Sequence, residues 1–396
     1  MRDAFLTSLG GFLYFIPRFR AQTEENRLGD QRLAWVALNL ALAPNALVLQ
    51  NLLERFDRPD AILAAEARAL AEVRGVTKRL IGRLKDPGLL ESAHAELRSA
   101  DRLSIRIVLR DDRGFPRILL QLPDPPPLLY MRGDLKEVDD PAVAVVGSRR
   151  ATEYGLEMAG RLASEIASAG VTIVSGLARG IDQEAHLGAL EAGGRTLAFL
   201  GSGLDRIYPR ESARLVERIS NAGAILSEFP LGTPPLAGNF PVRNRLISGV
   251  ARGTLVVEAA LASGSLITAR MALEQGREVF AVPGNVTART ARGSNQLIQQ
   301  GAKLVMSGRD VLEEIPGVIV SDEAPVECEE GTGTAEQERI LRHLPTAQPV
   351  ALEDLARVTE MEAGPLLAAL LKLEMDDRVK QLAGCRFMKT RRRSIG

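Results

Sequence analysis

Residues 141–186 read PAVAVVGSRRATEYGLEMAGRLASEIASAGVTIVSGLARGIDQEAH, and this stretch decides the fold class. It contains two short runs rich in β-branched residues, VAVVG (143–147) and VTIVSG (171–176), on either side of a helical segment at 153–169. Both runs are apolar on both faces, which is typical of strands in a sheet that is covered on both sides. A strand, a helix and a second strand form a right-handed crossover, so the stretch predicts a parallel pair of strands.

The same alternation of strands and helices continues to about residue 314. Further strands are predicted at 196–201, 224–228, 254–259 and 278–283, and the intervening helices at 181–192, 209–221, 243–252 and 266–276. The sequence therefore predicts an α/β fold with a Rossmann-like, doubly wound and mostly parallel sheet. Ligands of such sheets bind at the carboxyl ends of the strands, where several of the glycines of this chain lie.

The flanking segments have a different texture. Three helices and a short hairpin at the C-terminal end predict a winged helix, and an acidic stretch poor in apolar residues predicts a linker. The predicted organisation is an extension at 1–27, a helical domain resembling a sterile alpha motif at 28–100, the Rossmann-like domain at 101–314, the linker at 315–334 and the winged helix at 335–390.

Within the helical domain, AEVRGVTKRLIGRL (71–84) has the pattern of a helix, a tight turn at Gly75 and a second helix. This pattern resembles a helix-hairpin-helix, whose turn amides can hold a phosphate. A plain helical bundle remains the alternative for this segment.

Composition excludes several classes of protein. The 396 residues include 50 Lys+Arg and 50 Asp+Glu, so any site for a polyanion must be a local patch. Two cysteines and three histidines exclude a disulfide scaffold and argue against a Cys/His metal site. No apolar run reaches the roughly 20 residues that span a bilayer, and Asp3 spoils the signal-peptide pattern of the first residues, so we expect a cytoplasmic protein without a membrane partner.

Five loops that follow predicted strands carry the candidate site, and four of them contain arginine. After the first strand, Arg149 stands at a strand-to-helix turn, where backbone amides and a fixed cation suit a phosphate; a helix cap and a surface ion pair are the alternative roles of this turn. Glycines at 149 and 152 would be needed for a dinucleotide fingerprint, and neither is present. The residues predicted to contact phosphate or DNA are Gly147, Ser148, Arg149, Ser175, Gly176, Leu177, Ala178, Arg179, Gly180, Gly201, Ser202, Gly203, Arg210, Asn239, Phe240, Arg243, Asn244, Arg245, Gly264 and Ser265.

Individual side chains of these loops can also have purely structural roles. We interpret Asp182 as a stabiliser of the preceding loop and His186 as a structural histidine, because spacing fixes neither a nucleophile nor a metal partner near them. Phe240 could stack on a base or pack in the core. Glu258 could pair with an arginine of the crevice. A single phosphoryl cofactor needs one or two cations, so the repeated arginines indicate an extended anion, and no cofactor or metal is expected.

These segments together resemble the DNA-processing protein A (DprA/Smf) family. The resemblance rests on VAVVGSRRATEYG, VTIVSGLARGIDQEAHLGAL, TLAFLGSGLDRIYP, NFPVRNRLISG and VVEAALASGSLITARMALEQGREVFAVPG, and it covers about residues 115–305. It implies a protein that binds single-stranded DNA without catalysis, forms a homodimer through the Rossmann-like domain and loads the RecA recombinase in natural transformation. The family's phosphate-binding basic residues fall on Arg149 and Arg210.

Two other functions remain as alternatives. A nucleotide-processing hydrolase of the lysine-decarboxylase-like or phosphoribohydrolase type shares a related fold, but its PGGxGTxxE-like loop is replaced here by PGNVTART and SGSLITA. A DNA-binding regulator acting through the winged helix would need a basic recognition helix, whereas GPLLAALLKLEMDD carries more acid than base.

Overall fold

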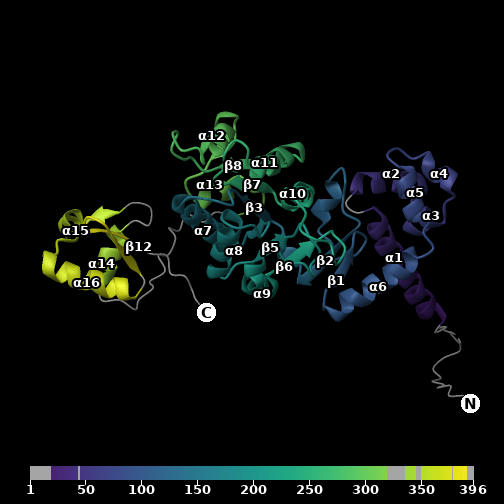
Figure 1. Ribbon diagram of the computed structural model, residues 1–396, viewed down its shortest axis with the longest axis horizontal. Coiled ribbons are helices and arrows are strands. Elements are labelled where there is room, and N and C mark those ends of the chain that lie inside the picture. Colours follow the sequence, from purple (N-terminus) through teal and green to yellow (C-terminus); the bar gives the residue numbers. More distant parts are fainter. Residues whose placement is uncertain (1–18, 43–44, 319–334, 345–348, 377, 390–396) are drawn as a thin grey trace, which may run out of the picture. The chain divides into compact units, whose positions relative to one another are not determined.

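The computed structural model describes residues 19–42, 45–318, 335–344, 349–376 and 378–389 (Figure 1). The chain divides into two compact units, residues 1–99 and residues 100–396. Helix α1 begins at Phe19, inside the segment predicted as an extension. Most of the predicted linker, from residue 319 on, lies outside the described residues.

The first unit is helical. Its buried side chains include Trp35, Leu38, Leu49, Leu52 and Ile62, which form an apolar centre. Its helices are α1 (Phe19–Leu42), α2 (Ala46–Phe56), α3 (Pro59–Ala64), α4 (Ala67–Ala71), α5 (Lys78–Leu84) and α6 (Leu89–Arg102), of which the last runs into the second unit.

The second unit is built on a nine-stranded sheet in the order β1-β2-β6-β5-β4-β3-β7-β8-β9. Strands β3 to β9 are parallel, and β1 and β2 form an antiparallel edge. This arrangement confirms the predicted fold class. The strands are β1 (Arg106–Leu109), β2 (Leu128–Gly133), β3 (Ala142–Val146), β4 (Thr172–Ser175), β5 (Thr196–Phe199), β6 (Ala224–Ser227), β7 (Gly253–Val256), β8 (Glu278–Ala281) and β9 (Lys303–Leu304).

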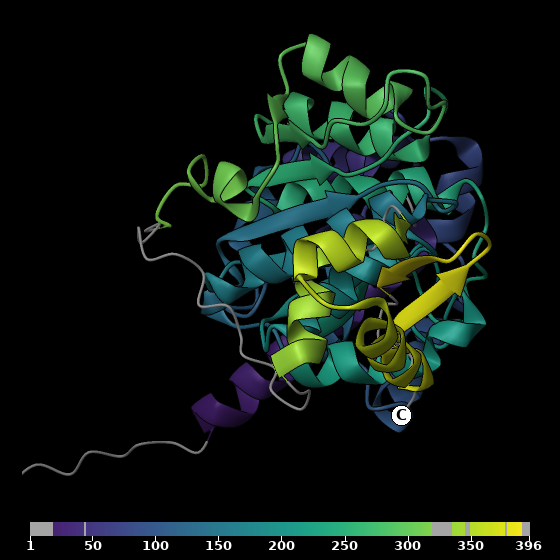
Figure 2. The same ribbon diagram turned by 90° about the vertical axis from the view of Figure 1, so that its left-hand side faces the viewer.

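Helices cover both faces of this sheet, as Figures 1 and 2 show. The α-helices are α7 (Glu153–Ser168), α8 (Ile181–Glu191), α9 (Ala213–Ala222), α10 (Asn239–Val250), α11 (Gly264–Glu274), α12 (Arg292–Gln299) and α13 (Gly308–Leu312), and the 3-10 helices are η1 (Arg117–Gln121), η2 (Glu137–Asp139) and η3 (Arg210–Ser212). The last three elements of the sheet region, α12, β9 and α13, are absent from the strands and helices predicted above.

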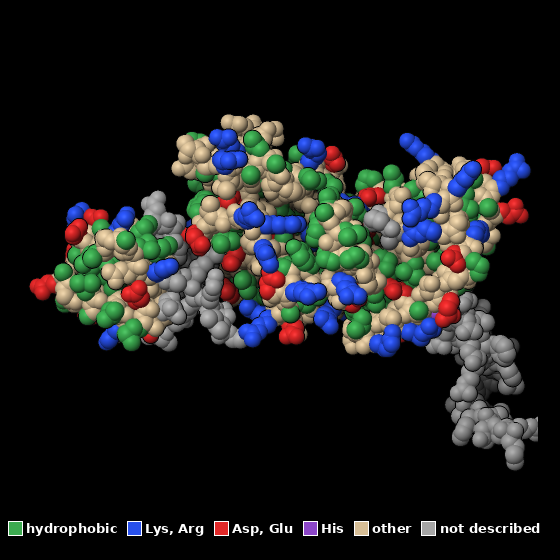
Figure 3. Space-filling view, in the orientation of Figure 1, with side chains coloured by type: hydrophobic (Ala, Val, Ile, Leu, Met, Phe, Trp, Pro, Cys, Tyr) green, Lys and Arg blue, Asp and Glu red, His purple; other side chains and the backbone are tan. Residues whose placement is uncertain are grey.

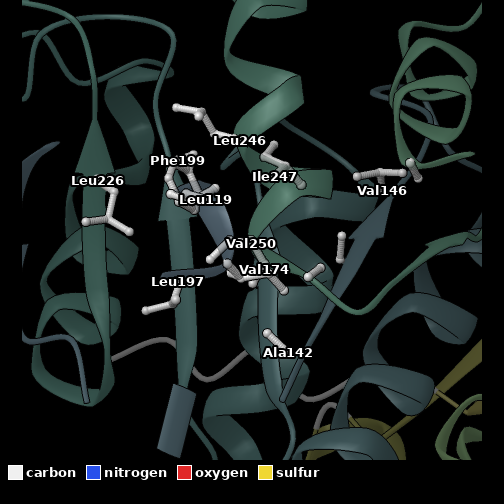
Figure 4. Close-up of a cluster of buried hydrophobic side chains, with 14 of the residues drawn as sticks. Leu119, Ala142, Val146, Val174, Leu197, Phe199, Leu226, Leu246, Ile247 and Val250 are labelled. Carbon is white, nitrogen blue, oxygen red and sulfur yellow. The ribbon is translucent and has the colours of Figure 1, made fainter. Parts of the chain in front are cut away.

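Strand β3 explains why both faces must be covered, because all five of its residues are buried. Ala142, Ala144 and Val146 point into a core closed by α10 and α11, where Leu246, Ile247 and Val250 pack on the strands (Figure 4). Val143 and Val145 point into a second core, closed by α7, α8 and α13. The alternation of side chains along a strand thus gives each face one apolar stripe.

The C-terminal part forms a winged helix with its own apolar core. Leu355, Leu366, Leu370, Val379 and Phe387 are among its buried side chains. Its elements are α14 (Ala335–His343), β10 (Val350–Ala351), α15 (Leu352–Thr359), α16 (Ala363–Met375), β11 (Val379–Leu382) and β12 (Arg386–Lys389), with a sheet in the order β10-β12-β11. In the part of the chain that the structure describes, no helix is both long and apolar enough to cross a membrane.

Candidate nucleic-acid interface

An exposed cation lies over an aromatic ring at the carboxyl ends of β3 and β5. The guanidinium carbon of Arg149, in the β3–α7 loop, lies 4.9 Å from the ring centre of Phe240, at the start of α10. The ring of Tyr208 lies 6.1 Å from that of Phe240, at an interplanar angle of 50°. Tyr208 is 45% exposed. Arg149 and Tyr208 are exposed and Phe240 is half-buried between them, so the surface combines a cation with two π-systems; we call it the Arg149–Phe240–Tyr208 cluster.

Glycines let the loops around this cluster come close together. Gly180 has a φ of +81°, and a Cβ there would lie 2.4 Å from the carbonyl oxygen of Ser148. A Cβ on Gly201 would lie 3.0 Å from Cδ1 of Phe240. Side chains at these two positions would therefore force apart the loops that carry Arg149 and Phe240.

Two further predicted arginines are exposed, and they differ in their partners. Arg179 pairs with Glu211, which neutralises its charge. Arg210 follows Tyr208 by two residues and lies in η3, one turn before α9 begins. Within the described residues, the side chain of Arg210 forms no ion pair, so its charge is left for an external anion.

The structure corrects the prediction for Arg243, which is 3% exposed. Its guanidinium donates to the carbonyl oxygens of Gly176, at 2.9 Å, and of Phe199. A Cβ on Gly176 would lie 2.6 Å from Nη2 of Arg243 and 2.8 Å from Oδ2 of Asp182, which explains the glycine. Burial lowers the pKa of Arg243 to about 10, against the opposing effect of Asp182. Arg243 ties the β4 and β5 ends to α10 and cannot reach a phosphate in solvent.

The prediction for Arg245 is corrected in the same way. Arg245 is 6% exposed and pairs with the buried Glu228 and, at 3.2 Å, with Asp124. Burial raises the pKa of Glu228 to about 7, although Arg245 opposes this shift. Arg245 therefore holds α10 to the segments before β2 and after β6.

Glu258 occupies the helix end that was predicted to receive a phosphate. Its carboxylate accepts hydrogen bonds from the backbone N–H of Thr152, at 3.2 and 3.3 Å, and from the Thr152 hydroxyl. The carboxylate thus accepts from the N–H of Thr152, the N-cap of α7, and places a negative charge at the positive end of the helix dipole. The partner of Glu258 is therefore Thr152, and not an arginine of the crevice.

Two models of protein families match this chain. One, described as DNA recombination-mediator protein A, covers residues 106–316, and the other, described as the DprA winged helix domain, covers residues 324–385. The chain belongs to the DNA recombination-mediator protein A family.

Relatives in this family include Protein Smf of Synechocystis sp., which is 33% identical over 90% of this chain and 98% of its own length. Protein Smf of Escherichia coli is 51% identical over 53% of this chain and 56% of its own length. Among solved structures, DNA processing protein A of Streptococcus pneumoniae is 35% identical, covers 70% of this chain and 95% of its own, and superposes with a TM-score of 0.59.

Asp182 and His186 have the structural roles that were expected for them. The Asp182 carboxylate accepts from the backbone N–H of Gly176, at 3.1 Å, and of Ala178, at 3.3 Å. Burial raises the pKa of Asp182 to about 6. Nδ1 of His186 lies 2.7 Å from the hydroxyl oxygen of Thr196, which itself donates to a carbonyl, so Nδ1–H is the donor. Burial beside Arg243 lowers the pKa of His186 to about 3.

Several other predicted polar residues are engaged within the protein. The Ser175 hydroxyl donates to Val145 O, the Ser202 hydroxyl to Arg206 O and the Asn239 amide to Gly201 O, while Asn244 Oδ1 accepts from Arg243 Nε and Ser265 shares a hydrogen bond with Ser263. They shape the loops of this family member. No group of His, Cys, Asp and Glu suited to a metal occurs among the described residues.

The sequence-based site omits Tyr208. An aromatic residue directly before Pro209, in a loop that follows a parallel strand, was the available signal. The fold turns this signal into a contact, because the ends of β3, β4 and β5 lie side by side.

Proposed function

We propose that this chain, as a DNA recombination-mediator protein, binds single-stranded DNA through the Arg149–Phe240–Tyr208 cluster together with Arg210. The observation that carries the proposal is the guanidinium of Arg149, exposed and 4.9 Å from the ring centre of Phe240. Proteins that bind single strands combine cations, which follow the phosphates, with aromatic faces, on which bases stack.

The aromatic rings of Tyr208, which is exposed, and of Phe240, which is half-buried, favour a single strand over a duplex at this surface. Bases of a duplex are stacked on one another and offer no face to Phe240 or Tyr208. The polar side chains of the loops are bonded internally, so direct reading of base edges is limited, and we expect little sequence preference.

Binding can be tested with fluorescently labelled oligothymidylate and a duplex of equal length, titrated with the full chain at several salt concentrations. The proposal requires the single strand to bind more tightly and its affinity to fall with salt. Tighter binding of the duplex that also depends on Arg149 would overturn it.

The finer part of the proposal concerns partners. We propose RecA as the recombinase that acts on the bound strand, natural transformation as the setting, and a homodimer through the Rossmann-like domain. The sheet edge at β9 supports the homodimer, since Leu304 in β9 is 40% exposed and Met306, two residues on, is 67% exposed. In sedimentation, wild type should behave as a dimer and Met306→Glu as a monomer. D-loop formation with RecA tests whether RecA acts on the bound strand.

We also propose that the chain is a binding protein rather than an enzyme. Glu258, which would act as the acid of a nucleotide hydrolase, caps α7 through Thr152, and His186 is fully buried. Incubation with nucleoside monophosphates should release no free base. Release that is abolished by Glu258→Gln would support the hydrolase instead.

The winged helix favours a protein partner over DNA. The exposed face of α16, which corresponds to the recognition helix of DNA-reading winged helices, carries Leu367, Leu371 and Met375, exposed by 42, 60 and 80%. An apolar stripe offers no charge to a phosphate. A regulator acting through this helix is therefore not the function that we propose.

A further inference from the structure

A second concentration of positive charge lies in the helical unit, on residues that are not part of the loops just described. Residues 73–85, VRGVTKRLIGRLK, form the turn between α4 and α5 and the whole of α5. They include five basic residues and no acidic one, and Glu72 and Asp86 flank them, in a chain that carries equal numbers of basic and acidic residues as a whole. All five are exposed, and Lys and Arg side chains stand out on this unit in Figure 3. They are Arg74, Lys78, Arg79, Arg83 and Lys85; we call this surface the basic hairpin.

The backbone of the basic hairpin is fixed. Gly75 has a φ of +85°, and a Cβ there would lie 2.9 Å from Cγ2 of Val48 on α2. The side-chain amide of Asn51, also on α2, donates to the carbonyl oxygen of Arg74 at 2.9 Å. Leu80 and Leu84 form the buried face of α5. The cations are therefore held on a rigid turn, which lowers the entropic cost of binding an ordered anion.

No carboxylate neutralises this surface within the described residues. Arg83 donates to Leu40 O and Lys85 to Leu63 O, both of them uncharged acceptors. The side chains of Arg74, Lys78 and Arg79 form no hydrogen bond or ion pair in that part of the chain. By contrast, Arg58 and Arg98 of the same unit pair with Asp60 and Glu91.

The basic hairpin has neither a free helix end nor an aromatic side chain, and this limits the ligand groups that it can contact. The Thr77 hydroxyl already accepts from the N–H of Leu80 at 3.2 Å, so the cationic side chains, rather than the helix end, are the groups left for a ligand. Residues 73–85 include no aromatic residue on which a base could stack. Such a surface can contact phosphates only, and duplex DNA presents the densest fixed row of them, one charge per about 1.7 Å of helix axis.

We propose that the basic hairpin binds the phosphate backbone of double-stranded DNA, without reading its sequence, as a second nucleic-acid site of this chain. The site is separate from the proposed single-strand site because it shares no residue with the Arg149–Phe240–Tyr208 cluster.

The test compares Lys78→Ala/Arg79→Ala with wild type in the full chain, using a random-sequence duplex and oligothymidylate at several salt concentrations. Loss of two phosphate contacts should flatten the slope of log K against log salt by about 1.8 for the duplex. The slope for the single strand should stay unchanged. Arg58→Ala/Arg98→Ala is the matched control, since both arginines are exposed on the same unit but paired, and it should leave both slopes as they are.

Each remaining outcome has a meaning. An unchanged duplex slope in a variant with wild-type melting temperature overturns the proposal. If Lys78→Ala/Arg79→Ala flattens the salt slope equally for the duplex and the single strand, the assignment to duplex DNA is overturned. The assignment is also overturned if the variant loses binding to anionic vesicles but keeps its binding to the duplex. Arg149→Ala/Arg210→Ala should weaken the single strand alone, so failure of the proposed function can be distinguished from failure of this site.

Discussion

Two pairs of arginines follow the carboxyl ends of parallel strands in this chain, and they behave in opposite ways. Arg149 and Arg210 are exposed, the first beside an aromatic ring. Arg243 and Arg245 are 3 and 6% exposed and are bonded to carbonyls and carboxylates. A position at the ligand edge of a sheet is therefore not enough to make an arginine part of a binding site. What separates the pairs is whether the fold supplies an internal partner.

The largest expected difference between the buried and the exposed arginines is in their contribution to the stability of the fold. Arg245→Ala should lower the free energy of unfolding by about 3–5 kcal/mol, because it leaves the Glu228 and Asp124 carboxylates without their cation. Urea denaturation followed by circular dichroism measures this change, and Arg245→Met/Glu228→Gln should recover part of it. A loss below about 1 kcal/mol, the size usual for surface ion pairs, would contradict the role of Arg245 as the required partner of these carboxylates.

Phe240→Leu tests whether the ring beside the exposed Arg149 contributes to the binding of single-stranded DNA. The variant keeps apolar volume but loses the π-face beside Arg149, so the free energy of binding to oligothymidylate should weaken by about 1–3 kcal/mol. Fluorescence anisotropy measures the change. Tyr154→Leu is the matched control, because Tyr154 is exposed on the same domain outside the cluster and should leave affinity unchanged. Equal effects of the two variants would remove Phe240 from the interface.

Arg149→Ala combined with Arg210→Ala should flatten the salt slope for the single strand by about 1.4, since each neutralised phosphate of a single strand contributes about 0.7. Stability should change by no more than about 0.5 kcal/mol, as is usual for surface side chains. Arg106→Ala/Arg252→Ala is the control, because both residues pair with exposed aspartates. If Arg149→Ala/Arg210→Ala is folded and has the wild-type salt slope, the phosphates of the single strand do not contact these two arginines.

The smallest expected effect is on pH dependence, and it belongs to the buried groups. The raised pKa values of Asp182 and Glu228 stabilise the fold at low pH, and this contribution is lost as pH rises from about 4 towards 6 and 7. The lowered pKa of His186 acts oppositely, giving stability above about 6.5 that is lost as pH falls towards 3.

The opposing trends partly cancel in the wild type between pH 4.5 and 6.5. His186→Gln removes one of them, so its melting temperature should fall more steeply than that of wild type as pH rises through this window. Differential scanning fluorimetry across the window tests the slope. Parallel curves for the two proteins would mean that His186 does not titrate as its burial requires.

Local patterns of the sequence were sufficient for the sheet. Runs such as VAVVG and VTIVSG are apolar on both faces, and only a covered, parallel sheet accommodates them, so strands β3 to β8 could be predicted. Elements with weak patterns, such as the two-residue strand β9, could not be predicted, because their existence depends on pairing with β8.

What the sequence by itself determined is therefore the fold class and the group of loops that meet at one edge of the sheet. Which side chains of those loops face solvent was decided by the tertiary structure. Arg243 and Arg245 lie inside α10, whose apolar residues pack on the sheet, and this packing brings their guanidinium groups to Gly176 and Glu228. Arg149 follows β3 and Phe240 lies in α10, after β6, so they meet only because the sheet and the packing of α10 bring these distant segments together at one edge. Hydrophobic periodicity is local and can be read from one segment, whereas the burial of a charge depends on partners from distant segments.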